Sequence, residues 1–298
     1  MAKPKILLQL DSDPQSSSFD AVVAIDAGVE HLLSHAGVSP QQAIGLTHGA
    51  MFTRGGQDLS ATAIFIGGSQ VEQAEAIARA VKDAFFGPVR VSVMVDPNGA
   101  NTTAAAAVLS AEQVLSLKDR RVLILGGSGP VGVRIASILG MLAADQNGPS
   151  QVKIVSRSLD RANQVCQQIT ENWGESIFQP CQGNSPQTNM ESVAESDIIF
   201  AAGAAGVSLL PEDWLKQGDS SNDPRVAIDL NAVPPAGLPG IEVTDRQTER
   251  SGWHCFGAIG VGGLKMKVHK QAIRQLFSAN DLFLDTPEIY ALAKSMIA

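Results

Sequence analysis

The chain has 298 residues, 44% of them hydrophobic and 17% charged, and a formal net charge of −8 at pH 7. This length and composition are typical of a soluble globular protein with two domains, and the acidic balance argues against general affinity for nucleic acid. No apolar run approaches the roughly 20 residues that span a bilayer, the first residues lack a signal-peptide layout, and three scattered cysteines without CxxC spacing favour a reduced, cytoplasmic setting.

The first 117 residues predict alternating strands and helices. The expected strands are residues 5–10, 61–66 and 89–95, and the expected helices are residues 19–33, 71–86 and the alanine-rich 102–116. A polar stretch at residues 118–120 ends this part of the chain. The pattern predicts an N-terminal α/β domain over residues 1–117.

The same alternation continues through the second part. Expected strands are residues 122–125, 152–155, 198–201, 226–230 and 255–259; residues 171–192, 211–225 and the glycine-rich 260–263 are expected loops, and residues 264–278 and 287–297 are expected helices. We therefore predict two α/β domains: a Rossmann-like, doubly wound parallel sheet over residues 118–263, and an N-terminal domain completed by the helices of residues 264–298. The active site is expected in the cleft between them.

A glycine-rich turn between a strand and a helix is the most informative motif. Gly127, Gly129 and Gly132 have the GxGxxG spacing, directly after the apolar run of residues 122–125. In a dinucleotide-binding turn, such glycines permit the tight turn, the close approach of a pyrophosphate and close helix packing. We predict that this turn, with Ser128, Pro130 and Val131, binds a nicotinamide dinucleotide; the alternative is a turn selected only for packing.

The end of the next strand bears on which dinucleotide is bound. A carboxylate there would hold the ribose 2′-hydroxyl of NAD, but this chain has Ser156 and Arg157. A guanidinium matches the geometry of a 2′-phosphate, so the sequence favours NADP, with NAD also possible. The alternative is a solvated arginine on a loop.

Later strand ends also carry small or amide residues. Ala202 and Gly203, Asn231 and Gly260 each follow an expected strand. Ligands of open α/β sheets lie beyond the carboxyl ends of the strands, so we predict that these residues contact the cofactor. Each loop is also consistent with a simple turn.

A basic helical segment and several polar strand ends are candidates for binding a substrate. Lys265 and His269 share one helix face at i,i+4 spacing, whereas Lys270 and Arg274 fit a solvated face. In the first domain, Asp20 lies early in an expected helix, and Asn98 and Thr102 follow a strand; helix capping is the structural alternative for Thr102. The five histidines have no HExxH spacing, so no metal site is expected.

The chain resembles the NAD(P)-dependent methylene-tetrahydromethanopterin dehydrogenases of methylotrophic bacteria over essentially its whole length. The resemblance is carried by blocks in one order: residues 19–23 (FDAVV), 53–56 (TRGG), 62–68 (TAIFIGG), 85–88 (FFGP), 98–106 (NGANTTAAA), 127–132 (GSGPVG) and 256–265 (FGAIGVGGLK). It implies reversible oxidation of 5,10-methylene-tetrahydromethanopterin to the methenyl form, with hydride passing to NADP, in cytoplasmic one-carbon (formaldehyde) metabolism. It also implies a homo-oligomer, a trimer or a hexamer.

The resemblance further implies roles for individual residues. Lys265 matches the lysine of the family's cleft, and it is expected to bind and orient the pterin. Asp20, Asn98, Thr102 and His269 are expected on the pterin side. The absence of a triad, a metal cluster or a nucleophile motif agrees with hydride transfer, which mainly requires two aligned rings.

Three rival interpretations stay open on the sequence. A methylene-tetrahydrofolate dehydrogenase differs only in the pterin that it uses. A shikimate-type dehydrogenase shares the two-domain plan but uses a Lys/Asp pair for which the chain offers no strong match. A non-catalytic NADPH-binding sensor would not need the polar strand ends of the first domain.

Overall fold

The computed structural model describes residues 3–174, 176–217 and 224–297. The chain forms two compact units: Met1–Thr102 with Met266–Ala298, and Thr103–Lys265. The C-terminal segment therefore belongs to the first unit. The division after Thr102 lies inside a helix, whereas the sequence interpretation drew its boundary at residue 117, where the polar stretch begins.

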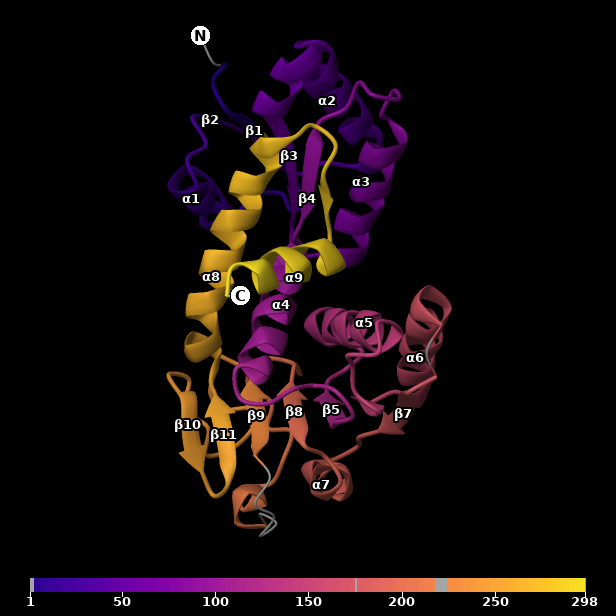
Figure 1. Ribbon diagram of the computed structural model, residues 1–298, viewed down its shortest axis with the longest axis vertical. Coiled ribbons are helices and arrows are strands. Elements are labelled where there is room, and N and C mark those ends of the chain that lie inside the picture. The colour runs from indigo at the N-terminus through magenta and orange to yellow at the C-terminus, as the bar shows by residue number, and fades with distance from the viewer. Residues whose placement is uncertain (1–2, 175, 218–223, 298) are drawn as a thin grey trace. The chain divides into compact units, whose positions relative to one another are not determined.

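The first unit is built on a five-stranded parallel sheet in the order β12-β4-β3-β1-β2 (Figure 1). The strands are β1 (Ile6–Asp11), β2 (His31–His35), β3 (Thr62–Gly67), β4 (Ser92–Val95) and β12 (Phe283–Leu284). The helices are α1 (Ser18–Asp26), α2 (Pro40–Phe52), α3 (Val71–Asp83), α9 (Thr286–Ser295) and the part of α8 (Ala258–Gln275) from Met266 on.

Alternation along the central strand β3 separates the two faces of this sheet. Ile64 and Ile66 belong to a buried apolar cluster with residues of α2 and α3, such as Ala43 and Ile77. Phe65 points to the opposite face, because successive side chains of a strand alternate. There it stacks on His269 of α8, with ring centroids 5.6 Å apart. The two faces thus carry different chemistry, one apolar and one mixed.

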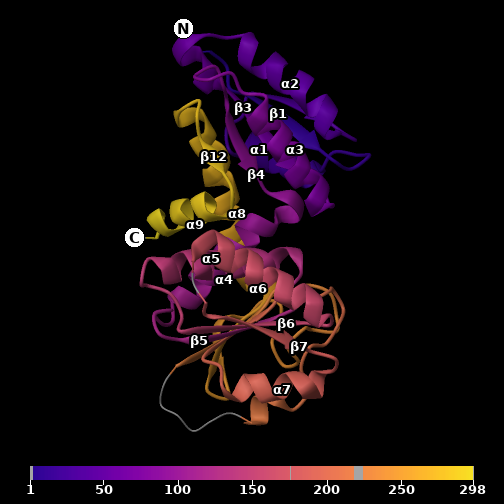
Figure 2. The same cartoon turned by 90° about the vertical axis from the view of Figure 1, so that its right-hand side faces the viewer.

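The second unit is a seven-stranded sheet in the order β10-β11-β9-β8-β5-β6-β7. Its strands are β5 (Arg121–Leu125), β6 (Gln151–Ser156), β7 (Phe178–Gln182), β8 (Ile198–Ala201), β9 (Arg225–Asp229), β10 (Arg246–Arg250) and β11 (Trp253–Phe256), and its helices are most of α4 (Ala100–Glu112), α5 (Pro130–Ala144), α6 (Leu159–Trp173) and α7 (Pro186–Ala194). All pairs are parallel except β10 with β11. Figure 2 shows α5 and α6 on one face of this sheet and α7 on the other. The expected α/β class, with a doubly wound parallel sheet and a second α/β unit, is confirmed.

Several predicted elements were wrong in extent or type. The helix expected over residues 19–33 ends at Asp26, since Gly28 adopts φ +92° and the chain then enters β2. Helix α2 was missed, although Ser39 forms a capping box and Pro40 occupies the first turn. The loop expected over residues 171–192 contains β7 and α7, the latter again opened by a serine capping box.

The segment before the last helices was also misread. The strand expected over residues 255–259 ends at Phe256, and the glycines of the expected loop at residues 260–263 lie inside α8. Strand β10 was missed, because its sequence, RQTER, has no apolar alternation. Part of the loop expected over residues 211–225 lies outside the described residues; its described part includes a short 3-10 helix, Trp214–Gln217.

Within the described residues, none of the helices combines the length and the apolar character that crossing a membrane requires.

Candidate active site

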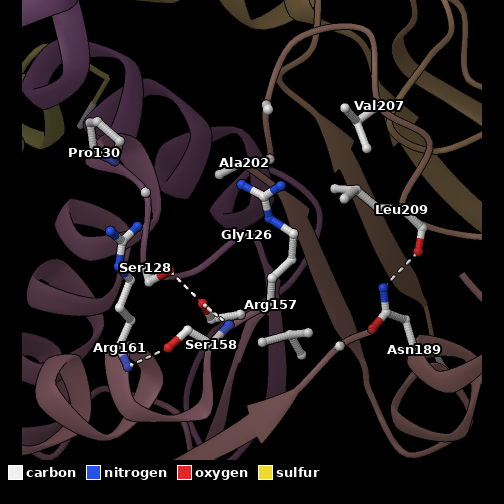
Figure 3. Close-up of a pocket in the computed structure, with 16 residues that line it drawn as sticks. Gly126, Ser128, Pro130, Arg157, Ser158, Arg161, Asn189, Ala202, Val207 and Leu209 are labelled. Carbon is white, nitrogen blue, oxygen red and sulfur yellow. Dashed lines mark hydrogen bonds between the residues drawn. The ribbon is translucent and has the colours of Figure 1, made fainter. Parts of the chain in front are cut away.

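A pocket of about 560 Å³ opens at the carboxyl ends of β5, β6 and β8 in the second unit (Figure 3). Seven of the residues predicted to bind the cofactor line it: Ser128, Gly129, Pro130, Ser156, Arg157, Ala202 and Gly203. They come from three separate strand ends that the parallel sheet brings to one edge. The pocket therefore lies where an α/β sheet offers room for a nucleotide.

The backbone of the glycine turn is packed too tightly for side chains. A Cβ atom on Gly126, which adopts φ +73°, would lie 2.5 Å from the Cα atom of Gly203, and one on Gly132 would lie 2.6 Å from the Cα atom of Gly127. Gly127 donates its N–H to the carbonyl of Val155 over 2.9 Å, which ties the turn to β6. Gly127 and Gly132 thus shape the turn without lining the pocket, and neither does Val131.

The first turn of α5 faces this pocket without a side-chain cap. Its N-cap residue is Gly129, which makes no side-chain hydrogen bond, and Pro130 occupies the first helical position. The N-terminal N–H groups and the helix dipole favour an anion at such an end. The hydroxyls of Ser128 and Ser156 lie 2.7 Å apart at the same place and add polar groups.

Two arginines line the pocket beyond the end of β6. Arg157 was predicted from the sequence, and Arg161 was missed because it lies one turn into α6. Figure 3 shows the two side chains running in the same direction along the pocket. Ser158 caps α6 by accepting the backbone N–H of Arg161, and its own N–H donates to the hydroxyl of Ser156 over 3.3 Å, so the start of the helix is tied to Ser156. Two cations and three serines form a site suited to a phosphate group.

Asn189 of α7 is a further pocket residue that the sequence interpretation missed, because its segment was expected to be a loop. Its Nδ2 donates to the carbonyl of Leu209 over 2.8 Å, and only 7% of the residue is exposed. Among the described residues, its Oδ1 has no hydrogen-bond partner. A buried acceptor left without a donor is costly, so a ligand with an N–H or O–H group would be favoured beside it.

Asn231 does not line the pocket but connects two loops of the same sheet edge. Its Oδ1 accepts the N–H of Gly206 over 3.4 Å and that of Val233 over 3.0 Å, and its Nδ2 donates to the carbonyl of Pro235. Asp229 lies at the start of this loop; burial raises the pKa of its carboxyl, although N–H groups including those of Leu238 and Asn231 oppose the shift. The side chain of Asn231 is therefore used to hold the loops in place.

Gly260 lies within the first turn of α8, outside the pocket. A Cβ atom there would lie 1.8 Å from the carbonyl oxygen of Asp245, so glycine is required by packing against that segment. The N–H groups of Ile259 and Gly260 both donate to the carbonyl of Val243. These groups of the helix end are consequently occupied within the protein.

The first unit contains a buried row of ionisable side chains on the face of the sheet that Phe65 occupies. The imidazole of His269, 0% exposed, has its Nε2 3.9 Å from Oδ1 of Asp20 and its Nδ1 3.9 Å from Oδ2 of Asp96. The side chain of Asp20 is 13% exposed and that of Asp96 is 0% exposed. The structure thus brings together His269 and Asp20, which the sequence predicted separately, and adds Asp96.

Thr102 supports this row from the start of α4. Its hydroxyl donates to Oδ2 of Asp96 over 2.7 Å, while the N–H groups of Asn101 and Thr102 donate to Oδ1. Thr102 is fully buried. The helix-capping alternative noted for this segment is close to what the structure shows, but Asp96 is the residue that accepts the N–H groups.

Asn98 is exposed beside the row and has an unusual backbone. It adopts φ +54°, a left-handed conformation that is uncommon for residues other than glycine, and its N–H donates to the carbonyl of Gly68 over 2.8 Å. Such conformations cost roughly 1–3 kcal/mol and gather at ligand sites. Lys265 lies on α8 one turn before His269 and is partly exposed.

The histidine, cysteine and carboxyl side chains were also compared with the requirements of a metal site and of a reactive thiolate. Among those residues, no group of three or more His, Cys, Asp or Glu side chains is arranged to hold a metal ion. All three cysteines are free. Burial raises the pKa of Cys166 to about 11 and that of Cys255 to about 12, and it also raises the pKa of Cys181. At neutral pH these groups are therefore thiols rather than nucleophilic thiolates.

Two family models match the chain one after the other. A model described as "Methylene-tetrahydromethanopterin dehydrogenase, N-terminal" matches residues 18–98, and a model described as "Shikimate / quinate 5-dehydrogenase" matches residues 109–245. The first match covers α1 and the row's Asp20 and Asp96. The second covers the glycine turn and both pocket arginines.

Two characterised relatives from Methylorubrum extorquens AM1 are similar over nearly the whole chain. "Bifunctional protein MdtA" is 38% identical over 295 residues, covering 98% of this chain and 99% of the relative. "NAD(P)-dependent methylenetetrahydromethanopterin dehydrogenase" is 34% identical over 298 residues, covering 97% of each.

Solved structures of low sequence identity share the fold. The quinate dehydrogenase of Corynebacterium glutamicum in complex with NAD has a TM-score of 0.52 and 13% identity, covering 99% of both chains. The shikimate 5-dehydrogenase of Listeria monocytogenes in complex with shikimate and NAD has a TM-score of 0.52 and 11% identity, covering 99% of this chain and 96% of that chain.

Proposed function

This chain belongs to the family of NAD(P)-dependent methylenetetrahydromethanopterin dehydrogenases, and on that premise we propose that it oxidises 5,10-methylene-tetrahydromethanopterin reversibly to the methenyl form. The reaction would serve one-carbon metabolism. Bound NADP supplies the hydride acceptor. The observation that carries the proposal is the pocket at the glycine turn, which combines an uncapped helix end with two arginines, in a chain whose relatives are similar from end to end.

The residues of the pocket fit a dinucleotide. The turn of Gly126 and Gly132 leaves no room for a Cβ atom, and the start of α5 suits a pyrophosphate. Arg157 and Arg161, with Ser156 and Ser158, would hold a 2′-phosphate, which favours NADP over NAD. The buried Oδ1 of Asn189 would accept a hydrogen bond from the bound nucleotide.

The substrate side is assigned to the first unit and to α8. We assign Lys265 to orienting the pterin, and Asn98 and the partly exposed Asp20 to contacting it. The fully buried His269 and Thr102 would act from behind these residues. Methylene oxidation needs no proton abstraction, and the cation that forms is stabilised by the two neighbouring nitrogens of the pterin. Side chains that bind, orient and supply negative charge are therefore sufficient.

The remaining parts of the proposal concern organisation. Residues 1–117 with 264–298 are proposed as the pterin domain, and residues 118–263 as the NADP domain. A cytoplasmic homo-oligomer, a trimer or a hexamer, is proposed; the three free cysteines are compatible with a reducing compartment.

A spectrophotometric assay of NADPH formation tests the function. The purified chain is offered methylene-tetrahydromethanopterin, methylene-tetrahydrofolate and shikimate, each with NADP and with NAD. The proposal predicts the highest kcat/KM with methylene-tetrahydromethanopterin and NADP, and no turnover of shikimate. A higher kcat/KM with the folate would identify a methylene-tetrahydrofolate dehydrogenase. Binding of NADPH without turnover of any substrate would identify a sensor instead.

A further inference from the structure

The buried row in the first unit places its ionisable groups in a fixed order. His269 separates two carboxyl groups, and each of its ring nitrogens lies 3.9 Å from a carboxyl oxygen, a distance typical of an ion pair rather than of a direct hydrogen bond. Two carboxyl groups face the imidazole: Asp20 from α1 and Asp96 from the segment after β4. The Phe65 ring of β3 stacks on it. On α8 itself, Lys265 lies one turn before His269. Phe19 of α1 adds a second aromatic ring, at 6.4 Å.

The inner end of the row is a buried carboxyl group whose two oxygens accept hydrogen bonds. Asp96 is fully buried, and its two oxygens accept the N–H groups of Asn101 and Thr102 and the hydroxyl of Thr102. Three donors directed at this carboxyl group use both of its oxygens as acceptors. A bare ring nitrogen would place a lone pair against such an oxygen, so the Nδ1 atom that faces Oδ2 has to carry a hydrogen.

Asp20 forms the outer end of the row, and its protonation state is linked to that of Nε2 of His269. If Nε2 were bare, its lone pair would face Asp20, and that carboxyl group would have to be protonated to avoid repulsion. The side chain of Asp20 is 13% exposed, however, and its helix start suits a negative charge. Contact with water and with the helix dipole favours the carboxylate there, and two anions near one imidazole favour its cation.

We propose that His269 is a buried imidazolium that positions Asp20, so that the row as a whole presents one net negative charge at its exposed end. The imidazolium neutralises Asp96 and fixes the orientation of Asp20 by attraction. Asp20 is then the group that meets the ligand, and His269 acts through it.

The consequence for catalysis rests on the proposed function. The methenyl product is a cation, so a fixed negative charge at Asp20 stabilises the product and the transition state that leads to it. Without the imidazolium, the row would either hold two repelling carboxylates or lose the charge of Asp20 by protonation. His269 is therefore a positioning residue for this step.

The protonation state can be measured without any substrate. Nitrogen-15 NMR of the full chain with labelled histidine distinguishes an imidazolium, in which both ring nitrogens carry hydrogen, from a neutral ring. The His269 signal is identified by elimination, through substitution of His31, His35, His48 and His254 by Asn, so the test does not require that a His269 variant folds. We expect an imidazolium at pH 7.5, a pH at which free histidine is mostly neutral. A neutral ring at that pH would overturn the proposal.

Kinetics then separate this inference from the proposed function. His269→Asn should lower kcat/KM for the pterin by about tenfold or more and reshape its pH profile, while the Kd for NADPH stays unchanged. His48→Asn, at an exposed position of α2, is the matched control and should change neither. An unchanged kcat/KM and pH profile in His269→Asn would overturn the positioning role even where the enzyme proves active. An imidazolium in a chain that turns over no pterin would contradict the proposed function alone.

Discussion

The pocket at the glycine turn of the second unit and the buried row of the first unit are built from different parts of the chain. The pocket is made mainly of backbone: the glycine turn, an uncapped helix end and small residues at three strand ends, with arginines on its rim. The row is made of side chains from α1, α8 and the segment between β4 and α4. The pocket should therefore be sensitive to added atoms, and the row to changes in charge. The following predictions test that difference, from the largest effect to the smallest.

Adding one carbon atom to the pocket turn should have the largest effect. In Gly132→Ala, the new Cβ atom would lie 2.6 Å from the Cα atom of Gly127 and 2.8 Å from the carbonyl oxygen of Gly126. Since these are backbone atoms, the turn has to shift, and we expect NADPH affinity to fall by at least about 100-fold. Calorimetric titration with NADPH measures it. Gly49→Ala on α2, where nothing lies within 4 Å, is the control; an unchanged Kd in Gly132→Ala would contradict the packing argument.

Removing the first arginine from the pocket rim should affect NADP selectively. Arg157→Ala removes a guanidinium that is assigned to the 2′-phosphate, so the KM for NADP should rise by roughly 10- to 100-fold while the KM for NAD changes little. Initial rates with each cofactor measure the ratio. The exposed Arg79→Ala variant on α3 controls for loss of a surface charge. Equal increases for both cofactors would remove Arg157 from the 2′-phosphate site.

Removal of the charge of Lys265 on α8 should change the kinetic constants for the pterin only. Lys265→Ala is expected to raise the KM for the pterin or to lower kcat, with a change of at least about tenfold in kcat/KM, because Lys265 is the group that we assign to orienting the substrate. The matched control is Lys267→Ala, two residues further along the same helix and exposed. Steady-state kinetics at saturating NADP measure both. If the two variants behave alike, Lys265 is a solvated lysine.

The second unit contains a partly exposed ion pair between Arg250 and Asp245, whose removal should have a smaller effect than a change in the buried row. Arg250 donates two hydrogen bonds to Asp245, over 2.7 and 2.8 Å. Burial of Asp245 raises its pKa, but these bonds and the N–H of Glu242 outweigh burial and hold the pKa below its usual range. A carboxyl group whose pKa is lowered by folding stabilises the fold above its unfolded pKa of about 4, and this contribution is lost as the pH falls through the lower folded value.

Arg250→Gln should therefore lower the free energy of unfolding by about 1 kcal/mol at pH 7, and by progressively less below pH 4. Urea denaturation at several pH values measures the difference. Glu249→Gln, exposed on the same strand, is the control. A difference that persists undiminished at low pH would show that Arg250 acts through packing instead of charge.

The two sites also differed in how far the sequence predicted them. The pocket depends on a local motif: the glycine spacing and the strand before it identified the turn and the residues around Arg157 without knowledge of the fold. Arg161 and Asn189 were missed, the first because it lies one helical turn beyond the motif and the second because α7 was expected to be a loop. Strand β8 was predicted to the residue, because a short buried apolar run admits few other interpretations.

The buried row was predicted only as separate residues. Asp20, Thr102 and His269 were singled out, but no spacing in the sequence relates residue 20 to residue 269, and Asp96 was not selected as a site residue. Their contact results from parallel pairing of β1 with β3 and of β3 with β4, together with the return of α8 to the first unit. The glycines of residues 260–263 were read as a loop because glycine disfavours helices. In α8, close packing of Gly260 against Asp245 and Arg246 outweighs that preference.

Hydride transfer is tested most directly by an isotope label on the hydrogen that leaves the methylene carbon. Methylene-tetrahydromethanopterin in which both hydrogens of the methylene carbon are replaced by deuterium is incubated with NADP and the purified chain, and the nicotinamide product is analysed by mass spectrometry and proton NMR. Direct hydride transfer from the pterin should give reduced NADP that carries one deuterium atom from the substrate in each molecule formed. Reduced NADP that carries only hydrogen from solvent, or no reduced NADP at all, would contradict it.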